Sequence, residues 1–340
     1  MIELDGGHLE GGGQILRTAV GLSAVTGKAC RIHDIRKGRE KPGLRPQHLR
    51  SIEAVAQLCR AELTGAKVQS SEITFRPGEL NPADSLTVQI GTAGAVTLVL
   101  QSLMIPLACV TRPVEVVVTG GTHVPWSPPW EYFESVFCWF LGKMGVTVKP
   151  KLRRCGFYPN GGGRVEIGVM PGQLKARDWL ERGGLLRTEV TSFATRDLQH
   201  ARVAERQIDG ARKRIEFNVE QAAYIEAPST GTAIFALARF EESVMGASAL
   251  GRRGKPAEKV GRECAAALLE QTQTDACLDE HMADQILPFM ALAAEDSTAK
   301  VTAITDHCRT NIWVIEQFLP AKFEVDEGQG RITCKHADNA

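Results

Sequence analysis

The sequence predicts an α/β protein (layered α and β elements) in which one unit occurs three times and a smaller domain interrupts the series. A strand followed by a glycine-containing turn and a helix occurs twice, and a related helix–strand–helix order returns near the carboxyl end. The helices that open the three copies begin near residues 14, 94 and 284, so the second interval is far longer than the first. Weak repetition with one overlong gap indicates an inserted domain. We predict a large domain over residues 1–184 and 277–340 and an insertion over 185–276.

The first copy alternates strands and helices: strands 2–4, 29–35 and 73–76, with helices 14–25 and 46–60. The second of these helices has Leu49, Ile52 and Val55 on one face, which is the spacing of an amphipathic helix. The second copy repeats this order, with strands 86–90, 114–118 and 165–169 and an apolar helix after Gly94. A further helix in this copy carries Phe133, Phe137 and Phe140 at helical spacing.

The third copy and the insertion show the same types of element. For the third copy we predict helices 286–294 and 311–319 and strands 301–305, 323–325 and 332–334. For the insertion we predict strands 188–192, 215–219 and 233–238 and helices 201–213 and 256–271. The insertion is therefore expected to form a small α/β domain of its own.

Composition favours an ordinary soluble protein without a membrane anchor. Lys and Arg number 40 and so do Asp and Glu, so any nucleic-acid binding requires a local basic face. The most apolar run, 95–110, contains Gln101 and Pro106 and is too short to cross a bilayer. The amino terminus reads as a strand and a turn rather than as a signal peptide. Nine cysteines without Cys-x-x-Cys spacing argue for a reducing, cytoplasmic location and against disulfides and structural zinc.

The glycine-rich segment at residues 10–17 is a candidate anion site. Three consecutive glycines allow a ligand to approach the backbone, and the N–H groups that start the helix favour negative charge. Glu10 suits a phosphate that carries Mg²⁺, because hard cations take carboxylate oxygens. A tight strand-to-helix turn would explain the same glycines. The segment is neither a dinucleotide fingerprint nor a P-loop.

Two further segments could bind a nucleotide or a nucleic acid. Residues 35–45 contain five cations and one acid in a loop, which suits polyphosphate or a nucleic-acid backbone but also a solvated surface. Residues 119–130 are rigid and aromatic, which suits a sandwiched purine or base and equally the packing of a helix start. Gln101 lies in an apolar helix, where its amide needs either a backbone partner or a ligand.

His307 is the sharpest catalytic candidate. It follows the strand predicted at 301–305, and strand ends commonly carry catalytic groups in α/β layers. A neutral imidazole can attack phosphorus and form a labile phosphoramidate. A hydrogen-bonded structural histidine is the alternative. Cys308 is the rival nucleophile, but continued strand geometry would point it to the opposite face.

Taken together, five segments resemble one family: residues 10–17, 36–44, 91–101, 156–163 and 307–311. In this order and with these spacings they closely resemble the RNA 3′-terminal phosphate cyclase family over nearly the whole chain, most weakly in the insertion. The resemblance implies three βαβαββ repeats interrupted by a small α/β insert. It also implies a ligase that uses ATP to convert an RNA 3′-phosphate end into a 2′,3′-cyclic phosphodiester during RNA processing, with no obligate protein partner.

The implied reaction has three steps. A histidine takes AMP from ATP, the AMP passes to the RNA 3′-phosphate, and the neighbouring 2′-hydroxyl expels it. Matched position by position, His307 is the adenylylated histidine, Gln101 an ATP contact, and Glu10 the ligand of Mg²⁺ or Mn²⁺. The remaining matches are the phosphate contacts Arg17, Arg36 and Arg39, the adenosine-binding segment His281, Met282, Ala283, Asp284 and Gln285, and the adenine-side wall Pro128 and Tyr132.

The sequence departs from the family at two places. His281 stands where the family usually has tyrosine and offers a smaller stacking face. His123, Val124 and Trp126 replace small or polar residues before Pro128. A non-catalytic RNA-processing scaffold and an enolpyruvyl-type transferase are the alternative functions. The scaffold has no need for His307 together with Glu10 and Gln101, and the transferase would carry more repeats on a longer chain.

Overall fold

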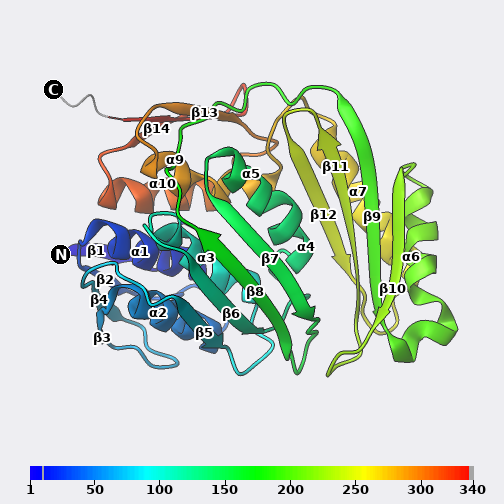
Figure 1. Cartoon of the computed structure of the whole chain (residues 1–340), viewed down its shortest axis with the longest axis horizontal. Helices are drawn as coiled ribbons and strands as arrows, with labels where there is room; N and C mark the ends of the chain where they lie inside the picture. Colours follow the sequence, from blue (N-terminus) through cyan, green and yellow to red (C-terminus); the bar gives the residue numbers. More distant parts are fainter. Residues whose placement is uncertain (10, 337–340) are drawn as a thin grey trace.

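The computed structural model describes residues 1–9 and 11–336 and has a layered α/β fold with four small sheets. Figure 1 shows three of these sheets with their helices in one body, and the fourth sheet beside them with its own helices. The predicted α/β fold class is confirmed. Glu10, the residue that the resemblance assigns to a divalent metal, lies outside the described residues.

The first two sheets share one topology. The first contains, in spatial order, β1 (Ile2–Asp5), β2 (Cys30–His33), β4 (Ile73–Arg76) and β3 (Glu62–Thr64). The second contains β5 (Ser85–Gln89), β6 (Val114–Gly120), β8 (Gly163–Met170) and β7 (Thr147–Arg154). In each sheet the first two strands are parallel and the other pairs are antiparallel. The chain order of each unit is therefore βαβαββ.

Each of these two units also has two helical segments. The first unit has α1 (Gly13–Thr26) and α2 (Pro46–Cys59). The second has α3 (Val96–Leu107) and a longer helical segment made of α4 (Trp130–Tyr132), the π-helix η1 (Phe133–Phe137) and α5 (Cys138–Lys143). Helix α1 packs against α2 and α3 and also against α10 (Asp306–Phe318) of the third unit. This contact brings the glycine turn before α1 next to His307.

The third unit has a split first strand. Its sheet has the order β13 (Ser297–Lys300), β15 (Arg331–Lys335) and β14 (Lys322–Asp326). Where the other sheets have a parallel first strand, Trp179 pairs with Ala299 and Leu278 pairs with Val301 in isolated parallel bridges. Trp179 precedes the insertion and Leu278 follows it, so the insertion interrupts the first strand of the third repeat.

Two predictions in the third unit are wrong: the strand at 301–305 and the start of the helix expected at 311–319. The strand expected at 301–305 is β13, which ends at Lys300, and α10 begins at Asp306 with Thr305 as its N-cap. The hydroxyl of Thr305 accepts a hydrogen bond from Cys308 N at 3.2 Å, which fixes this start. The helix expected at 286–294 is confirmed as α9 (Leu287–Leu292), and α8 (Glu280–Gln285), which was not predicted, precedes it. Pro288 stands at the start of α9, where a missing N–H is tolerated.

The inserted segment has a sheet with two helices packed on it. The strand order is β10 (Val219–Ile225), β9 (Leu185–Thr195), β11 (Thr232–Phe240) and β12 (Val244–Leu250). The helical elements are η2, a 3-10 helix (Arg196–Ala201), α6 (Val203–Arg212) and α7 (Ala257–Thr272). The strand predicted at 215–219 is wrong, since β10 begins at Val219. Strand β12 was not predicted, because its glycine and alanines have low β-propensity.

The inserted segment has its own apolar core, which includes Val190, Ile234 and Leu268. Phe235, Leu237 and Val244 of the same sheet instead join the large core of the three repeats. The insert therefore packs against the repeats through one face of its sheet. The domain limits at residues 184–185 and 276–277 stay a prediction. Among the described residues, no helix combines the length and apolarity that crossing a membrane would require.

Candidate active site

The start of α1 is an uncapped helix N-terminus. Its N-cap is Gly12 in an extended conformation, and no side chain caps the first N–H groups. A methyl group at Gly13 would collide with Nε2 of His48 and lie 3.0 Å from the Arg17 guanidinium. Glycine at this position therefore lets two polar side chains approach the turn. Uncapped N–H groups and adjacent cations form a surface suited to an anion.

His307 lies in the first turn of α10 and faces the second residue of α1. Its Nδ1 is hydrogen-bonded to Oε1 of Gln14. The side chain is exposed rather than interior, although it stands among cations. Partial burial lowers the pKa of His307, and the charges of Arg17, Arg39 and His281 lower it further, against an opposing effect of Asp306. The imidazole is therefore neutral at neutral pH.

Gln14 is itself held in one orientation. Its Nε2 donates to Oδ2 of Asp284 at 2.6 Å and more weakly to the carbonyl of His307 at 3.3 Å. Both partners are acceptors, so the amide oxygen of Gln14 must be the atom that faces His307 Nδ1. An oxygen can only accept, so Nδ1 carries the proton and Nε2 carries the lone pair of the imidazole.

Two ionisable side chains, Asp284 and Arg17, lie next to Gln14 and His307. Burial raises the pKa of Asp284 to about 7, although His281, Arg17 and the Gln14 hydrogen bond each act in the opposite direction. Burial lowers the pKa of Arg17 to about 10, so the guanidinium stays charged at neutral pH. Both side chains retain some contact with solvent. Arg17 is therefore a partly desolvated cation next to the Asp284 carboxyl group, which titrates near neutrality.

A second set of hydrogen bonds joins α1, α8 and α10. Thr18 donates to Oδ1 of Asn311 at 2.7 Å, and Asn311 Nδ2 donates to the carbonyl of Asp284 at 2.8 Å. Asn311 is 3% exposed, so these bonds are shielded from water. They fix the position of α10, and hence of His307, relative to the glycine turn.

The cationic loop at 35–45 lies on the other side of the turn. Arg36 donates to the carbonyls of Lys41 and Gly43 at 2.6 and 3.2 Å, which folds the loop on itself. Arg39 is exposed and contributes to the lowered pKa of His307. Burial and the charges of Arg17, Arg36 and Arg45 lower the pKa of His48 to about 3. Because Nδ1 of His48 accepts from Arg45 N at 3.3 Å, the neutral ring has its proton on Nε2, towards Gly13.

A small cavity continues from this turn between the three repeats. Its wall includes Gln14, Arg17, Gln101, Asp284 and Gln285. Apolar walls come from Ile105, Phe137 and Phe289. Gln101 therefore lines the same cavity as Gln14 and Arg17 of α1 and as Asp284 and Gln285 of the 281–285 segment. A separate, more open hollow lined by Ala56, Arg60 and Leu86 lies at the α2–β5 side and shares no residue with it.

Some residues of the 281–285 segment line the cavity, and others are buried in the large core. Met282 and Ala283 are fully buried in the large core, so their side chains pack and only their backbone could reach a ligand. His281 is exposed and stands edge-on to Tyr132, with ring centroids 5.9 Å apart. The hydroxyl of Tyr132 donates to Oδ1 of Asp279 at 2.5 Å. The carbonyl of Pro128 accepts from the Thr97 hydroxyl at 2.8 Å, which anchors the aromatic loop on α3.

Cys308 is not a competing nucleophile. The side chain is fully buried, and burial raises the pKa of its thiol to about 11. The strand geometry that would have pointed it to the opposite face does not continue, since Cys308 lies in α10. A thiol that is protonated and enclosed is a poor nucleophile.

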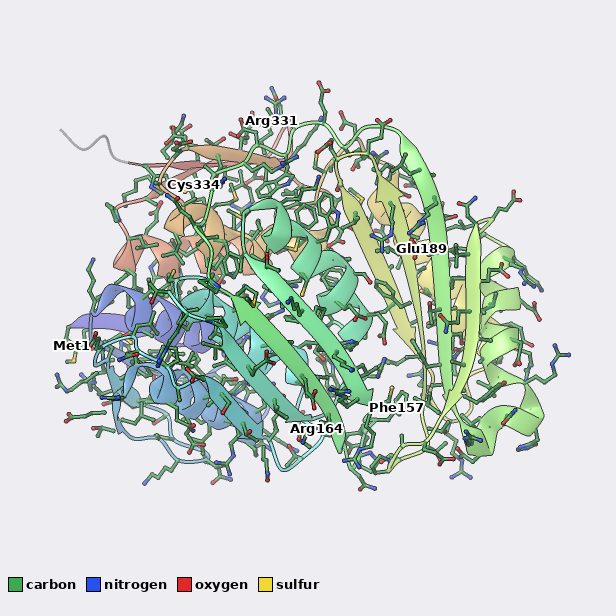
Figure 2. All side chains as sticks on the ribbon, viewed as in Figure 1. Met1, Phe157, Arg164, Glu189, Arg331 and Cys334 are labelled. Carbon is green, nitrogen blue, oxygen red and sulfur yellow. The ribbon has the colours of Figure 1, made fainter. Side chains whose placement is uncertain are left out.

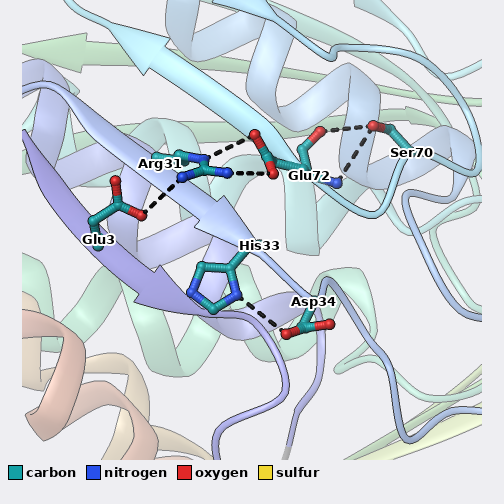
Figure 3. Close-up of polar contacts among 6 residues, drawn as sticks. All are labelled: Glu3, Arg31, His33, Asp34, Ser70 and Glu72. Atoms are coloured by element: carbon teal, nitrogen blue, oxygen red, sulfur yellow. Dashed lines mark hydrogen bonds and ion pairs between the residues drawn. The ribbon is translucent and has the colours of Figure 1, made fainter.

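A separate polar cluster lies on the outer face of the first sheet (Figure 3). Arg31 binds both carboxylate oxygens of Glu72 at 2.8 Å and approaches Glu3 at 3.5 Å. His33 Nδ1 lies 3.2 Å from Asp34, which also faces Lys37 at 3.3 Å. Asp5, His33 and Asp34 are close enough to share a cation. These three side chains already have hydrogen-bond or ion-pair partners on the face of the sheet. We therefore do not include them in the candidate active site.

Three residues of the site were missed from sequence: Gln14, His48 and Asn311. Gln14 and Asn311 stood inside the segments quoted for the resemblance, but neither received a role. The hydrogen-bond partners of Gln14 lie 270 and 293 residues away along the chain, and Thr18, the partner of Asn311, lies 293 residues away. No local sequence pattern covers such separations. His48 follows the cationic loop directly, and its position at the start of a helix beside five cations was the available signal.

Comparison with known proteins shows which family the chain belongs to. A model of the family "RNA 3′-terminal phosphate cyclase" matches residues 8–325. RNA 3′-terminal phosphate cyclase of Pyrococcus furiosus is 43% identical over 342 residues, covering 97% of this chain and 96% of the relative. The Methanopyrus kandleri and Methanosarcina barkeri proteins of the same name are 42% and 39% identical, each over 97% of this chain and over 96% and 98% of the relative. The chain therefore belongs to the RNA 3′-terminal phosphate cyclase family.

Proposed function

We propose that this protein is an ATP-dependent RNA 3′-terminal phosphate cyclase, a ligase that forms a 2′,3′-cyclic phosphodiester through AMP bound to His307. One observation carries the proposal: Gln14 accepts from Nδ1 of His307, which leaves the lone pair on Nε2. A neutral imidazole whose proton is held on one nitrogen can attack with the other. The lowered pKa of His307 keeps it in this form at neutral pH.

The proposed reaction has three displacements. First, His307 Nε2 attacks the α-phosphorus of ATP, forming the N–P bond while the bond to the bridging oxygen breaks and pyrophosphate leaves. Next, an oxygen of the RNA 3′-phosphate attacks the same phosphorus and releases the imidazole. Finally, the 2′-hydroxyl attacks the 3′-phosphorus, loses its proton and expels AMP. The last step is intramolecular, so it depends on orientation more than on a strong base.

The described residues fit the anionic groups of these substrates. Arg17 lies beside the uncapped start of α1, and Nε2–H of His48 adds a neutral donor there. The charge of Arg36 acts on His48 and that of Arg39 acts on His307, so both arginines belong to the same cationic surroundings. Gln101, Gln285 and the exposed ring of His281 are available to the adenosine. Mg²⁺ or Mn²⁺, with Glu10 as the ligand that the resemblance assigns, would neutralise phosphate oxygens. All nine cysteines are free thiols, which supports our proposal of a cytosolic enzyme.

The test is transfer of radioactivity from α-labelled ATP to the protein in the presence of Mg²⁺ or Mn²⁺. We expect an acid-labile, alkali-stable label on the wild type and none on His307→Ala. His33→Ala, on the outer face of the first sheet, is the matched control and should label normally. A wild-type protein that takes up no label would favour the non-catalytic RNA-processing scaffold.

A further inference from the structure

The two most exposed large hydrophobic side chains of the described residues are aromatic and lie on adjacent loops. Trp126 is 95% exposed and Tyr158 is 68% exposed. Trp126 also has a φ of +64°, a left-handed conformation that is unfavourable for a bulky residue. Such strain is characteristic of ligand-binding segments. Neither packing nor backbone preference accounts for a tryptophan at this position.

The loops that carry these rings are joined to each other. The backbone N–H groups of Thr122 and His123 donate to the carbonyl of Gly156 at 2.9 and 3.2 Å. His123 and Phe157 also form a bridge, and their rings stack at 5.2 Å. Figure 2 places Phe157 where the second sheet meets the inserted segment. Tyr158 follows Phe157 directly and Trp126 lies three residues after His123, so both residues belong to the joined loops at this end of the sheet.

The same loops rest on the turn that opens α3. Gly161 packs against Ala93, and the Pro128 carbonyl accepts from Thr97 in the first turn of the helix. Gln101, one turn further along α3, lines the cavity of the candidate active site. An α-helix rises about 1.5 Å per residue, so Gln101 lies roughly 6 Å beyond Thr97. The aromatic loops are thus next to the proposed nucleotide pocket.

A cationic strand leads to these loops. Strand β7 is the edge of the second sheet, and its half-buried residues Val148 and Leu152 pack on the core. The residues that alternate with them, Lys149, Lys151 and Arg153, face outward. Figure 1 shows β7 running towards the junction with the inserted segment. Arg164, labelled at that end in Figure 2, shares one carboxylate, Glu166, with Arg153.

Resting on the proposed function, we propose that single-stranded RNA approaches along the outer face of β7 and stacks bases near its 3′ end on Trp126 and Tyr158. Alternating cations and exposed rings are the usual combination for single-stranded nucleic acid. The eight residues of β7 extend over about 26 Å, enough for several nucleotides. Lysines on an edge strand also prevent edge-to-edge pairing, but that role requires no exposed rings at the end of the strand.

The aromatic part is tested by binding of a fluorescent single-stranded RNA with a 3′-hydroxyl, without ATP, so that no reaction occurs. We expect Trp126→Ala and Tyr158→Ala each to weaken binding at least about 5-fold, and Trp126→Phe to retain most of the affinity. Leu186→Ala is the matched control, because Leu186 is 63% exposed at the start of β9, at the far end of the inserted sheet. Equal affinity for Trp126→Ala and Leu186→Ala would overturn the proposal.

The cationic part is tested by the salt dependence of the same binding. Lys149→Gln and Lys151→Gln should each reduce the slope of log K against log salt by about 0.7. Lys322→Gln, on the third sheet, should leave the slope unchanged. An unchanged slope in the β7 variants would show that RNA does not bind along this strand.

Labelling by ATP without RNA separates this proposal from the proposed function. Trp126→Ala should label His307 as well as the wild type does. A loss of labelling in this variant would assign the ring to the nucleotide and overturn the RNA site. Self-association that Trp126→Ala abolishes would assign it to a protein contact, with the same consequence. Wild-type protein that binds RNA through the rings but takes no label would overturn the cyclase proposal alone.

Discussion

His307 obtains its chemical properties from neighbours on other elements. Gln14 on α1 determines which nitrogen carries the proton, and Asp284 on α8 determines which way the Gln14 amide points. Burial lowers the pKa of His307, the charges of Arg17 and Arg39 and the neighbouring His281 lower it further, and the ring is therefore kept neutral. A nucleophilic histidine needs these conditions together, since a protonated or misoriented ring has no lone pair to direct at phosphorus.

The pH dependence of the labelling rate should show how the charges near His307 affect its pKa. The pKa of His307 is lowered, so protonation should halve the labelling rate only at a pH below the ordinary histidine pKa of 6.5. We call this pH the acid limb of the rate profile. Arg39→Gln removes one of the charges that lower it and should move the limb towards higher pH. The rates are measured at saturating ATP, because Arg39 is also a proposed phosphate contact.

Arg309→Gln is the control for this shift. Arg309 lies on α10, is paired with Glu327 at 2.6 Å, and is not among the main causes of the lowered pKa of His307. A limb at the same pH in Arg39→Gln and the wild type would mean that Arg39 does not act on the imidazole.

Single residues were predictable where a local motif pointed to them. His307, Gln101 and the arginines were proposed as site residues because the segments around them resemble a family. Gln14 received no role, because a glutamine in the first turn of a helix is unremarkable until Asp284 and His307 are brought to it. The identity of a positioning residue depends on contacts across hundreds of residues, which no pattern in a single sequence contains.

At the scale of elements, the start of α1 should tolerate no side chain at Gly13. A methyl group there would displace His48 and Arg17 from the uncapped turn. We expect Gly13→Ala to raise the ATP concentration for half-maximal labelling at least about 10-fold, equivalent to ~1.4 kcal/mol. Gly142→Ala in α5, where nothing lies within 4 Å of the added carbon, should label normally and be up to about 1 kcal/mol more stable. Similar ATP requirements in the two variants would contradict an anion site at the turn.

The loop after β6 depends on a buried ion pair. His123 Nε2 lies 2.8 Å from Glu131, and the two residues are 1% and 8% exposed. Burial alone would lower the pKa of His123, but Glu131 and a hydrogen bond to Cys155 outweigh it and raise the pKa to about 10. The folded protein therefore holds a proton that the unfolded chain loses above about pH 6.5.

This pair predicts a specific loss of stability with rising pH. The contribution of His123 is fully present below about pH 6.5 and declines by ~1.4 kcal/mol per pH unit until about pH 10. Glu131→Gln should cost about 3 kcal/mol at pH 6 and much less at pH 10. Chemical denaturation at both pH values gives the comparison. A cost that does not change with pH would mean that the pair is not charged.

Regular helices were predicted better than short strands. Helices α1, α2 and α7 lie within one or two residues of their predicted limits, because a long apolar period determines them. Strand β13 was misplaced because residues 301–305 are richer in β-branched side chains than residues 297–300. Thr305 is instead the cap of α10. The cap at the helix start outweighs the local propensity for strand.

At the scale of the whole molecule, Asp279 joins three parts of the chain. Its carboxylate accepts from Tyr132 of the second repeat, from His281 N and Met282 N at the start of α8, and from Gly246 N of the inserted sheet. The residue is fully buried. The segment that we propose to bind adenosine begins two residues later, so this carboxylate connects the insert to the proposed nucleotide pocket.

Removing this carboxylate should destabilise the whole protein. Asp279→Ala leaves the Gly246 N–H and the Tyr132 hydroxyl buried without an acceptor, and we expect a loss of about 3 kcal/mol in the free energy of unfolding. Asp275→Ala, which removes only an exposed ion pair with Lys300, should cost less than about 1 kcal/mol. Denaturant titration measures both. Equal losses would show that the Asp279 contacts add nothing to the stability of the assembled domains.

The interrupted strand of the third repeat affects how the chain can assemble. Trp179 and Leu278 occupy neighbouring places along the edge of β13, so the insert leaves and re-enters the third sheet at almost one point. An unfolded segment of this length would impose an entropic cost on bringing those two residues together. If the insert condenses around its own core first, its ends are already close. The order in which the pieces acquire structure then decides how readily the last sheet, and with it His307, reaches its place.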